Sequence, residues 1–269
     1  MENMEDKNSP TELPRYIKAF GISYAGTLPK IKKSDNPLQP VFEAITNALE
    51  AIQMSSNKGK GEIVIKVNLL RSAFSTEEKY FDFDSVQVED NGIGFNEEEF
   101  ERLENLNDTR KGFLNKGSGR VQYLHAFGKT EVVSTFQDAS STTGYKERVF
   151  TLSKGDAFLK QNAIIHYLSL KDTSASDSKT VVTFKNPLYK KDSDFYKDLH
   201  LEELKSSIID RYLATFCENR EHLPQIKLQK NVNQETVEEK QIESGDIPLI
   251  DQQKDIIVHY SKLSADGRT

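Results

Sequence analysis

Residues 41–52 read VFEAITNALEAI and residues 88–95 read VEDNGIGF, and these two stretches decide the fold that we expect. The first predicts a helix over 39–54, because its apolar residues recur every three or four positions. The second is the end of a short strand that stops at Asp-Asn-Gly, a strong turn signal. Both stretches also carry polar side chains that could bind a ligand or take part in catalysis.

The segments around these stretches predict helices and strands in an irregular order. Alternating apolar and polar residues indicate strands over 61–69, 83–89, 130–136, 145–152, 163–170 and 179–185. Further helices are predicted over 96–106, 120–127 and 200–217. This order lacks regular βαβ units. We therefore expect an α+β fold, a two-layer sandwich in which helices cover one face of a mixed, mostly antiparallel sheet.

The composition limits the classes of protein to consider. The 269 residues include 36 Lys and Arg and 42 Asp and Glu, and this net charge of −6 argues against binding nucleic acid through bulk positive charge. A single cysteine, Cys217, excludes an internal disulfide and a cysteine-based zinc site. No apolar run of about 18 residues predicts a membrane span, and the acidic N-terminus has no signal-peptide pattern. We expect a cytoplasmic protein that does not enter a membrane.

The chain is expected to have three parts. Residues 1–19 predict an N-terminal arm and residues 20–225 the main domain. From 226 to 269 the composition shifts to Gln, Glu, Asn and Lys, which indicates a linker and the start of a possible second domain. Within that last part, residues 253–263 (QKDIIVHYSKL) are compatible with one more strand.

The predicted helix over 39–54 places Glu43, Asn47 and Glu50 on one face. A solvated stripe on an ordinary amphipathic helix explains this spacing. The alternative is a binding site, because Mg²⁺ prefers oxygen ligands such as the carbonyl of Asn47. Glu43, one turn away, could orient and deprotonate an attacking water molecule.

The segment from Asp90 to Gly94 also has two interpretations. Asn-Gly after a strand is typical of an ordinary turn. In the functional interpretation, Gly92 and Gly94 lack a Cβ atom and let the backbone approach a flat ligand closely. Asp90 then offers a carboxylate that accepts a hydrogen bond from an exocyclic amine, such as that of adenine.

A basic glycine loop, Lys116-Gly-Ser-Gly-Arg120, precedes the predicted helix over 120–127. Glycines at a helix start expose backbone N–H groups at the positive end of the helix dipole, which favours anions. Lys111, Lys116 and Arg120 add positive charge there. A flexible loop explains the same pattern.

Two later stretches also carry patterns with an ordinary and a functional interpretation. Thr180 lies on the predicted strand over 179–185, where a threonine is an ordinary β-branched residue. Gly128-Lys129-Thr130 resembles the end of a P-loop, but residue 123 is Tyr where the first glycine is required. A strand rather than a helix follows it, so we reject a P-loop.

In this order, the Glu43 and Asn47 helix, the D-x-G-x-G turn, the basic glycine loop and the late threonine strand resemble the GHKL superfamily. That superfamily includes gyrase B, the heat-shock chaperone ATPases, sensor histidine kinases and mismatch-repair MutL. The resemblance covers roughly residues 20–220 and implies the Bergerat ATP-binding fold. It implies that Glu43 is the general base, Asn47 the Mg²⁺ ligand and Asp90 the adenine-binding carboxylate. The nucleotide contacts that it implies, besides Asn47 and Asp90, are Glu50, Gly92, Ile93, Gly94, Lys111, Lys116, Gly117, Ser118, Gly119, Arg120 and Thr180.

The chain departs from the family pattern in two places. Lys179 stands where the family usually has the glycine of G-T-x-V, and the loop has one G-x-G where many members have a longer G-x-x-G-x-G. The resemblance still implies Mg²⁺-dependent ATP binding and slow hydrolysis that drives lid closure or homodimerisation. It also implies a protein or nucleic-acid client, engaged through domains beyond this chain. The alternatives are a nucleotide-gated scaffold with little turnover, or an interaction protein with a degenerate site.

Overall fold

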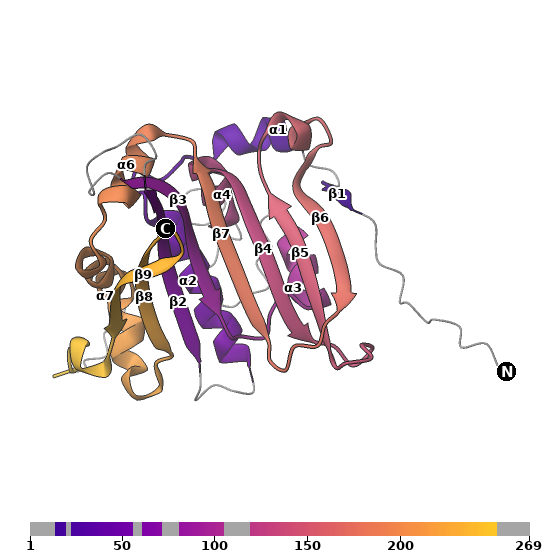
Figure 1. Cartoon of the computed structure of the whole chain (residues 1–269). Coiled ribbons are helices and arrows are strands. Elements are labelled where there is room, and N and C mark those ends of the chain that lie inside the picture. The colour runs from indigo at the N-terminus through magenta and orange to yellow at the C-terminus, as the bar shows by residue number, and fades with distance from the viewer. Residues whose placement is uncertain (1–13, 20–22, 56–60, 72–80, 105–118, 252–269) are drawn as a thin grey trace, which may run out of the picture.

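The protein is an α+β structure built on one nine-stranded mixed sheet (Figure 1). The computed structural model describes residues 14–19, 23–55, 61–71, 81–104 and 119–251. Strands in these ranges are β1 (Arg15–Lys18), β2 (Glu62–Arg71), β3 (Phe81–Asp90), β4 (Phe127–Gln137), β5 (Tyr145–Leu152), β6 (Ala163–Asp172), β7 (Lys179–Pro187), β8 (Gln225–Val232) and β9 (Glu235–Ile242). The helices are α1 (Tyr24–Thr27), α2 (Gln39–Met54), α3 (Glu97–Glu104), α4 (Gly119–Ala126), α5 (Asp156–Leu159), α6 (Lys190–Asp198) and α7 (Leu201–Glu218). Short 3-10 turns are η1 (Leu28–Lys30), η3 (Arg220–His222) and η4 (Ser244–Asp246).

The strand order across the sheet is β1-β6-β5-β4-β7-β3-β2-β8-β9. Neighbouring strands run antiparallel except β2 and β8, which are parallel. The expected α+β class and the mixed, mostly antiparallel sheet are therefore confirmed. Among the helices in the described ranges, none is both long and apolar enough to cross a membrane.

Helix α2 spans the residues that the apolar periodicity predicts. Pro40 lies in its first turn, where a backbone N–H is not needed for a helical hydrogen bond. Just before the helix, the Asn36 side chain accepts a hydrogen bond from the Leu38 N–H at 2.9 Å, which fixes the turn that leads into it. The helix ends where Ser55 adopts an extended conformation. In Figure 1, α2, α3 and α4 lie behind the sheet.

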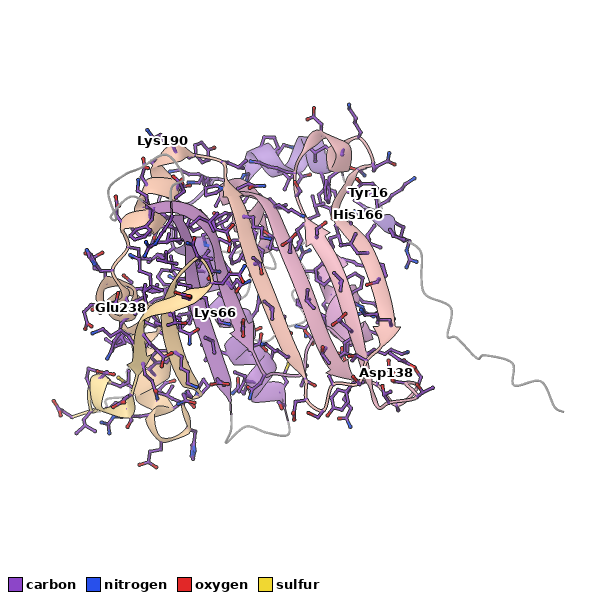
Figure 2. The ribbon with its side chains drawn as sticks, viewed as in Figure 1. Tyr16, Lys66, Asp138, His166, Lys190 and Glu238 are labelled. Atoms are coloured by element: carbon purple, nitrogen blue, oxygen red, sulfur yellow. The ribbon has the colours of Figure 1, made fainter. Side chains whose placement is uncertain are left out.

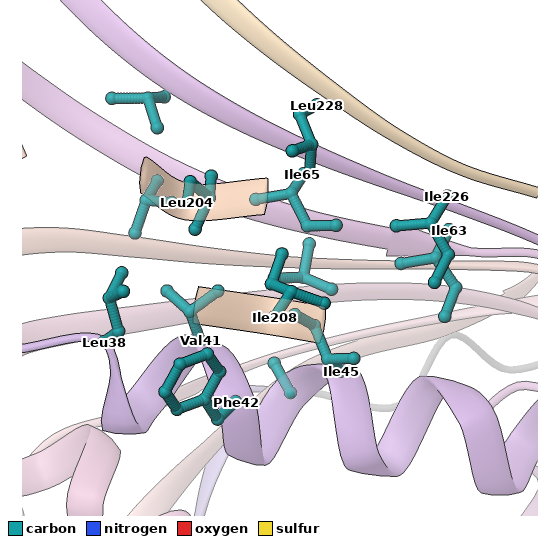
Figure 3. Close-up of a cluster of buried hydrophobic side chains, with 14 of the residues drawn as sticks. Leu38, Val41, Phe42, Ile45, Ile63, Ile65, Leu204, Ile208, Ile226 and Leu228 are labelled. Carbon is teal, nitrogen blue, oxygen red and sulfur yellow. The ribbon is translucent and has the colours of Figure 1, made fainter. Parts of the chain in front are cut away.

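The main hydrophobic core lies between α2, α7 and the strands β2 and β8. Figure 3 shows Val41 and Ile45 of α2 close to Ile63 and Ile65 of β2, with Ile208 of α7 among them. All five of these side chains are completely buried. Truncating such a residue to alanine typically costs about 2–5 kcal/mol, so this core fixes the position of α2 on the sheet.

The opposite face of the sheet is polar and carries cross-strand ion pairs. Glu89 of β3 accepts hydrogen bonds from Lys66 of β2 at 2.5 Å and pairs with Lys179 of β7 at 2.9 Å. Glu131 of β4 pairs with Lys185 of β7 at 2.7 Å. Figure 2 shows Lys66 on the face turned toward the viewer, away from the helices. Helices α2, α3 and α4 and the core therefore share one side of the sheet.

The segment after residue 226 corrects one expectation. Instead of a linker, β8 pairs with β2 in parallel from Gln225 to Val232, and β9 pairs with β8. Ile226 and Leu228 are buried in the same core as β2. The polar composition was misleading because β9 is an edge strand, and edge strands commonly carry charged residues. The strand predicted over 253–263 lies outside the described residues, and a second domain remains a prediction.

The last part of the expected N-terminal arm is also a strand of the sheet. Arg15–Lys18 forms β1 and pairs antiparallel with β6. The ring of Tyr16 stacks on the ring of His166, with 4.3 Å between the ring centroids (Figure 2). Residues 1–13 of the arm lie outside the described ranges.

Candidate functional site

A cavity of about 140 Å³ lies on the helical side of the sheet. Its lining comes from α2, α3 and α4 and from the inner face of β3, β4, β5 and β7. An apolar cavity of about 150 Å³ is large enough to hold benzene, so this partly open cavity has the size of one flat ring. The predicted site residues that line it are Glu43, Asn47, Asp90, Ile93, Gly94, Gly119, Arg120 and Thr180.

Asp90 lies in one polar row with Thr180 and Ser134 across three adjacent strands. The strand register pairs Asp90 of β3 with Thr180 of β7, and Thr180 with Ser134 of β4. Residues paired directly across a ladder project from the same face of a sheet, here the face of the cavity. The exposed fractions are 8% for Asp90, 4% for Thr180 and 0% for Ser134. The sheet thus places three buried oxygen-bearing groups side by side.

The environment of Asp90 controls its charge. Burial raises the pKa of its carboxyl to about 7, although a hydrogen bond from the Gly92 N–H opposes this shift. That N–H donates to Asp90 Oδ1 at 2.9 Å, which leaves Oδ2 as an acceptor for a ligand. Asp90 therefore changes its protonation state near neutral pH.

The two glycines of the turn have different roles. A Cβ at Gly92 would lie 2.5 Å from the Ala51 Cβ and 2.6 Å from the Ala51 carbonyl carbon, so Gly92 lets the turn pack on α2. Ile93 strengthens this contact by donating its N–H to the Ala51 carbonyl at 3.2 Å. Gly94 has a φ of +75°, and a Cβ there would lie 2.7 Å from the Thr135 carbonyl oxygen. We expected both glycines to form the pocket floor, but only Gly94 lines the cavity.

Glu43 and Asn47 line the cavity from α2, one turn apart. The Gln39 side chain donates a hydrogen bond to Glu43 Oε1 at 2.7 Å. Asn47 donates through its Nδ2 to the Tyr123 hydroxyl at 3.2 Å, so its carbonyl Oδ1 is the atom left for a cation. Burial raises the pKa of Tyr123, which keeps the hydroxyl protonated. Glu50, expected on the same face, is not among the residues that line the cavity.

Helix α4 begins directly against Glu43. A Cβ at Gly119 would lie far inside van der Waals distance of Glu43 Oε2 and 3.0 Å from its Cδ, so the glycine makes room for the carboxylate. The next residue, Arg120, is 9% exposed and lines the cavity. The remaining loop residues that we expected to contact phosphate lie outside the described residues: Lys111, Lys116, Gly117 and Ser118.

Sequence reasoning missed several residues that support the site. Besides Gln39, Tyr123 and Ser134, these include Arg148 of β5, which is 1% exposed. Arg148 donates hydrogen bonds to the carbonyl oxygens of Phe95 and Asn96 at 2.8 and 2.9 Å and so holds the segment that follows the turn. The contacts of Ser134 and Arg148 depend on the register of distant strands, which no local pattern predicts, whereas the i, i+4 spacing of Gln39 and Glu43 on α2 was a local signal that could have been found.

The side chains of the site could bind Mg²⁺ only together with ligands from a substrate or from water. Within the described ranges, no group of three or more His, Cys, Asp and Glu residues could hold an ion. Mg²⁺ at phosphate sites needs few protein ligands, because substrate phosphates and water supply the others. A single amide oxygen from Asn47, beside the Glu43 carboxylate, fits this requirement.

The comparisons with known proteins give a limited result. No protein-family model and no curated protein matches the chain. Among solved structures, the chain is similar to one described as the N-terminal domain of a DNA repair protein, with a TM-score of 0.41 and 17% sequence identity. The match covers 76% of this chain and 50% of that one, so this chain spans half the length of that structure.

Proposed function

We propose that the chain binds ATP with Mg²⁺ and hydrolyses it slowly, in a GHKL-type pocket on a two-layer Bergerat fold. The observation that carries the proposal is the meeting of separately predicted residues at one cavity. Glu43 and Asn47 come from one motif, Asp90 and Gly94 from a second, and Thr180 from a late strand, and all of them line it.

The base of the nucleotide would occupy this cavity. Its volume of about 140 Å³ suits a ring system rather than a whole nucleotide. Asp90 Oδ2 would accept a hydrogen bond from the adenine amine, beside the hydroxyl of Thr180. Ile93 and Gly94 of the turn would pack against the ring.

The phosphates would lie toward Glu43, Asn47 and the start of α4. The positive end of the α4 dipole and the Arg120 guanidinium both favour negative charge there. Asn47 Oδ1 would hold Mg²⁺, which neutralises phosphate charge when bound. Glu43, oriented by Gln39, would accept the proton of the attacking water.

Two variants test these roles. Glu43→Gln should retain ATP binding but lose turnover by about 10²–10⁴-fold, the usual contribution of a general base. Asp90→Asn should lose binding, because its amide can present a donor to the adenine amine. Glu50→Gln is the matched control, since Glu50 lies on the same helix but outside the cavity.

Thermal unfolding and phosphate release measure the two effects separately. ATP at 100 times its Kd should stabilise the parent protein by about 2.7 kcal/mol. An absence of any ATP-dependent stabilisation would contradict the proposal. Phosphate release from Glu43→Gln at the parental rate would contradict hydrolysis through Glu43.

The proposal also includes an ATP-dependent homodimer, which sedimentation with and without ATP would detect. It further includes a client that binds outside this chain.

A further inference from the structure

A chain of hydrogen bonds runs from the turn after β3 to the wall of the cavity. The Phe95 N–H donates to Ser134 Oγ at 2.8 Å, and Ser134 Oγ lies 2.9 Å from Thr180 Oγ1. Thr180 and Phe95 line the cavity, whereas Ser134 does not. Ser134 would therefore affect a ligand through one of these two neighbours, and of the two only the Thr180 hydroxyl can change its hydrogen-bonding role.

The geometry indicates the direction of these hydrogen bonds. A backbone N–H can only donate, so Ser134 Oγ accepts from Phe95. The single hydroxyl proton of Ser134 is then available for Thr180, and Thr180 Oγ1 accepts it. In the opposite direction, the Ser134 proton would have no acceptor among the contacts described for it. Such an unpaired group is unfavourable at a position with no solvent exposure.

This direction turns the hydroxyl proton of Thr180 away from Ser134 and toward the cavity. Beside it in the strand register lies Asp90, which can only accept when ionised. The cavity wall thus offers an acceptor, the Asp90 carboxylate, next to a donor, the Thr180 hydroxyl. Adenine presents an amine donor next to a ring-nitrogen acceptor, whereas guanine presents a carbonyl acceptor next to an N–H donor. The polarity of the wall matches adenine and opposes guanine.

We propose that Ser134 is a positioning residue that orients the Thr180 hydroxyl as a donor and thereby makes the pocket select adenine over guanine nucleotides. The inference rests on the proposed nucleotide site and adds a specificity determinant to it. A neutral hydrogen bond contributes little more than tenfold to affinity. Ser134→Ala should therefore weaken ATP binding by about three- to tenfold and lower the ratio of ATP to GTP affinity by a similar factor.

The test compares the Kd values for ATP and for GTP, each with Mg²⁺, by titration calorimetry on the full chain. Thr180→Val removes the donor itself and should cause a similar loss. In the double variant, Ser134→Ala should add nothing to the effect of Thr180→Val, because Ser134 acts through Thr180. Thr130→Val is the control. Thr130 is 1% exposed, lies on the same face of β4 and has an Oγ1 without a hydrogen-bond partner in the described ranges.

The outcomes separate this inference from the proposed function. A Ser134→Ala protein that binds ATP with the parental ATP-to-GTP ratio would overturn the inference alone. So would an equal loss of ATP affinity from Ser134→Ala in the parent and in the Thr180→Val background, since that indicates a purely structural role. If Ser134→Ala does not fold, Thr180→Val with an unchanged ratio overturns the inference in the same way. A parent protein that binds neither nucleotide would overturn the proposed function as well.

Discussion

Replacing Gly119 by Ala should displace the Glu43 carboxylate without unfolding the protein. The new Cβ would overlap Glu43 Oε2 and lie 3.0 Å from Cδ and 3.5 Å from Cγ. Ordinary contacts between such atoms are nearer 4 Å, so the carboxylate must move by about 1 Å. The displaced atoms end a flexible side chain, and the backbone of Gly119, the first residue of α4, is not in the left-handed region, so Ala adds no backbone strain there. We therefore expect a melting temperature close to that of the parent.

The effect on catalysis should be much larger than the effect on stability. A reacting group misplaced by about 1 Å can lower a rate by about 10². The single-turnover rate of ATP hydrolysis should fall by that factor, while the Kd for ATP changes by less than about threefold, because in the proposed binding mode Asp90 and not Glu43 binds the base. Phosphate release measures the rate, and titration calorimetry measures the Kd.

Gly26→Ala in α1 is the control for the Gly119 variant. A Cβ at Gly26 meets its nearest neighbour, Ser23 Oγ, at 3.5 Å, an ordinary contact that does not involve Glu43. That variant should hydrolyse ATP at the parental rate. A Gly119→Ala protein with the parental rate would show that the position of Glu43 does not matter. A Gly119→Ala protein that fails to fold would show that Glu43 cannot move aside, and either result refutes the reasoning.

Three further predictions concern the surroundings of the site. Gln39→Leu should slow phosphate release by about three- to tenfold at unchanged ATP affinity, because Glu43 loses a hydrogen bond that orients it; an unchanged rate would exclude this role. Burial raises the pKa of Asp90 to about 7, so between pH 4 and 7 the folded protein retains a proton that the unfolded chain has lost. As the pH rises through this range, the unfolding free energy of the parent should therefore fall by on the order of 4 kcal/mol relative to that of Asp90→Asn. Denaturant unfolding of both proteins at several pH values measures this difference, and a difference that stays constant with pH would contradict the prediction. Arg148→Met should lower the unfolding free energy by about 3 kcal/mol, because it leaves two carbonyl oxygens without their donor; a loss below 1 kcal/mol in urea unfolding would argue against it.

The fold was predictable from the sequence where one face of an element is buried. Helix α2 matches its predicted range because it has a clear apolar face, and β5 begins and ends where the sequence pattern indicated. Strand β9 was missed because seven of its eight side chains are partly or fully exposed, which leaves no apolar face to recognise. The parallel pairing of β8 with β2 depends on the crossover through α7 and has no local signal.

The candidate site was predictable only for residues inside a local motif. Glu43, Asn47 and Asp90 follow from spacing and turn chemistry, and the structure brings them to one cavity. Ser134 reaches the site through the register of β4 and β7, which the sequence does not specify. For Gly92, the local motif gave the wrong role. The motif suggested a ligand contact, but the missing Cβ allows the turn to pack on Ala51.

The packing of the turn on Ala51 has a consequence for motion. The contact fastens α2 to the turn after β3 at the C-terminal end of the helix, about two turns or about 12 Å from Glu43. Val41 and Ile45 flank Glu43 in the sequence and are completely buried, so the core also holds the end of the helix that carries Glu43. Because α2 is held at both ends, the turn and the Glu43 carboxylate keep a constant separation, and a ligand that bridges them would meet a preformed site.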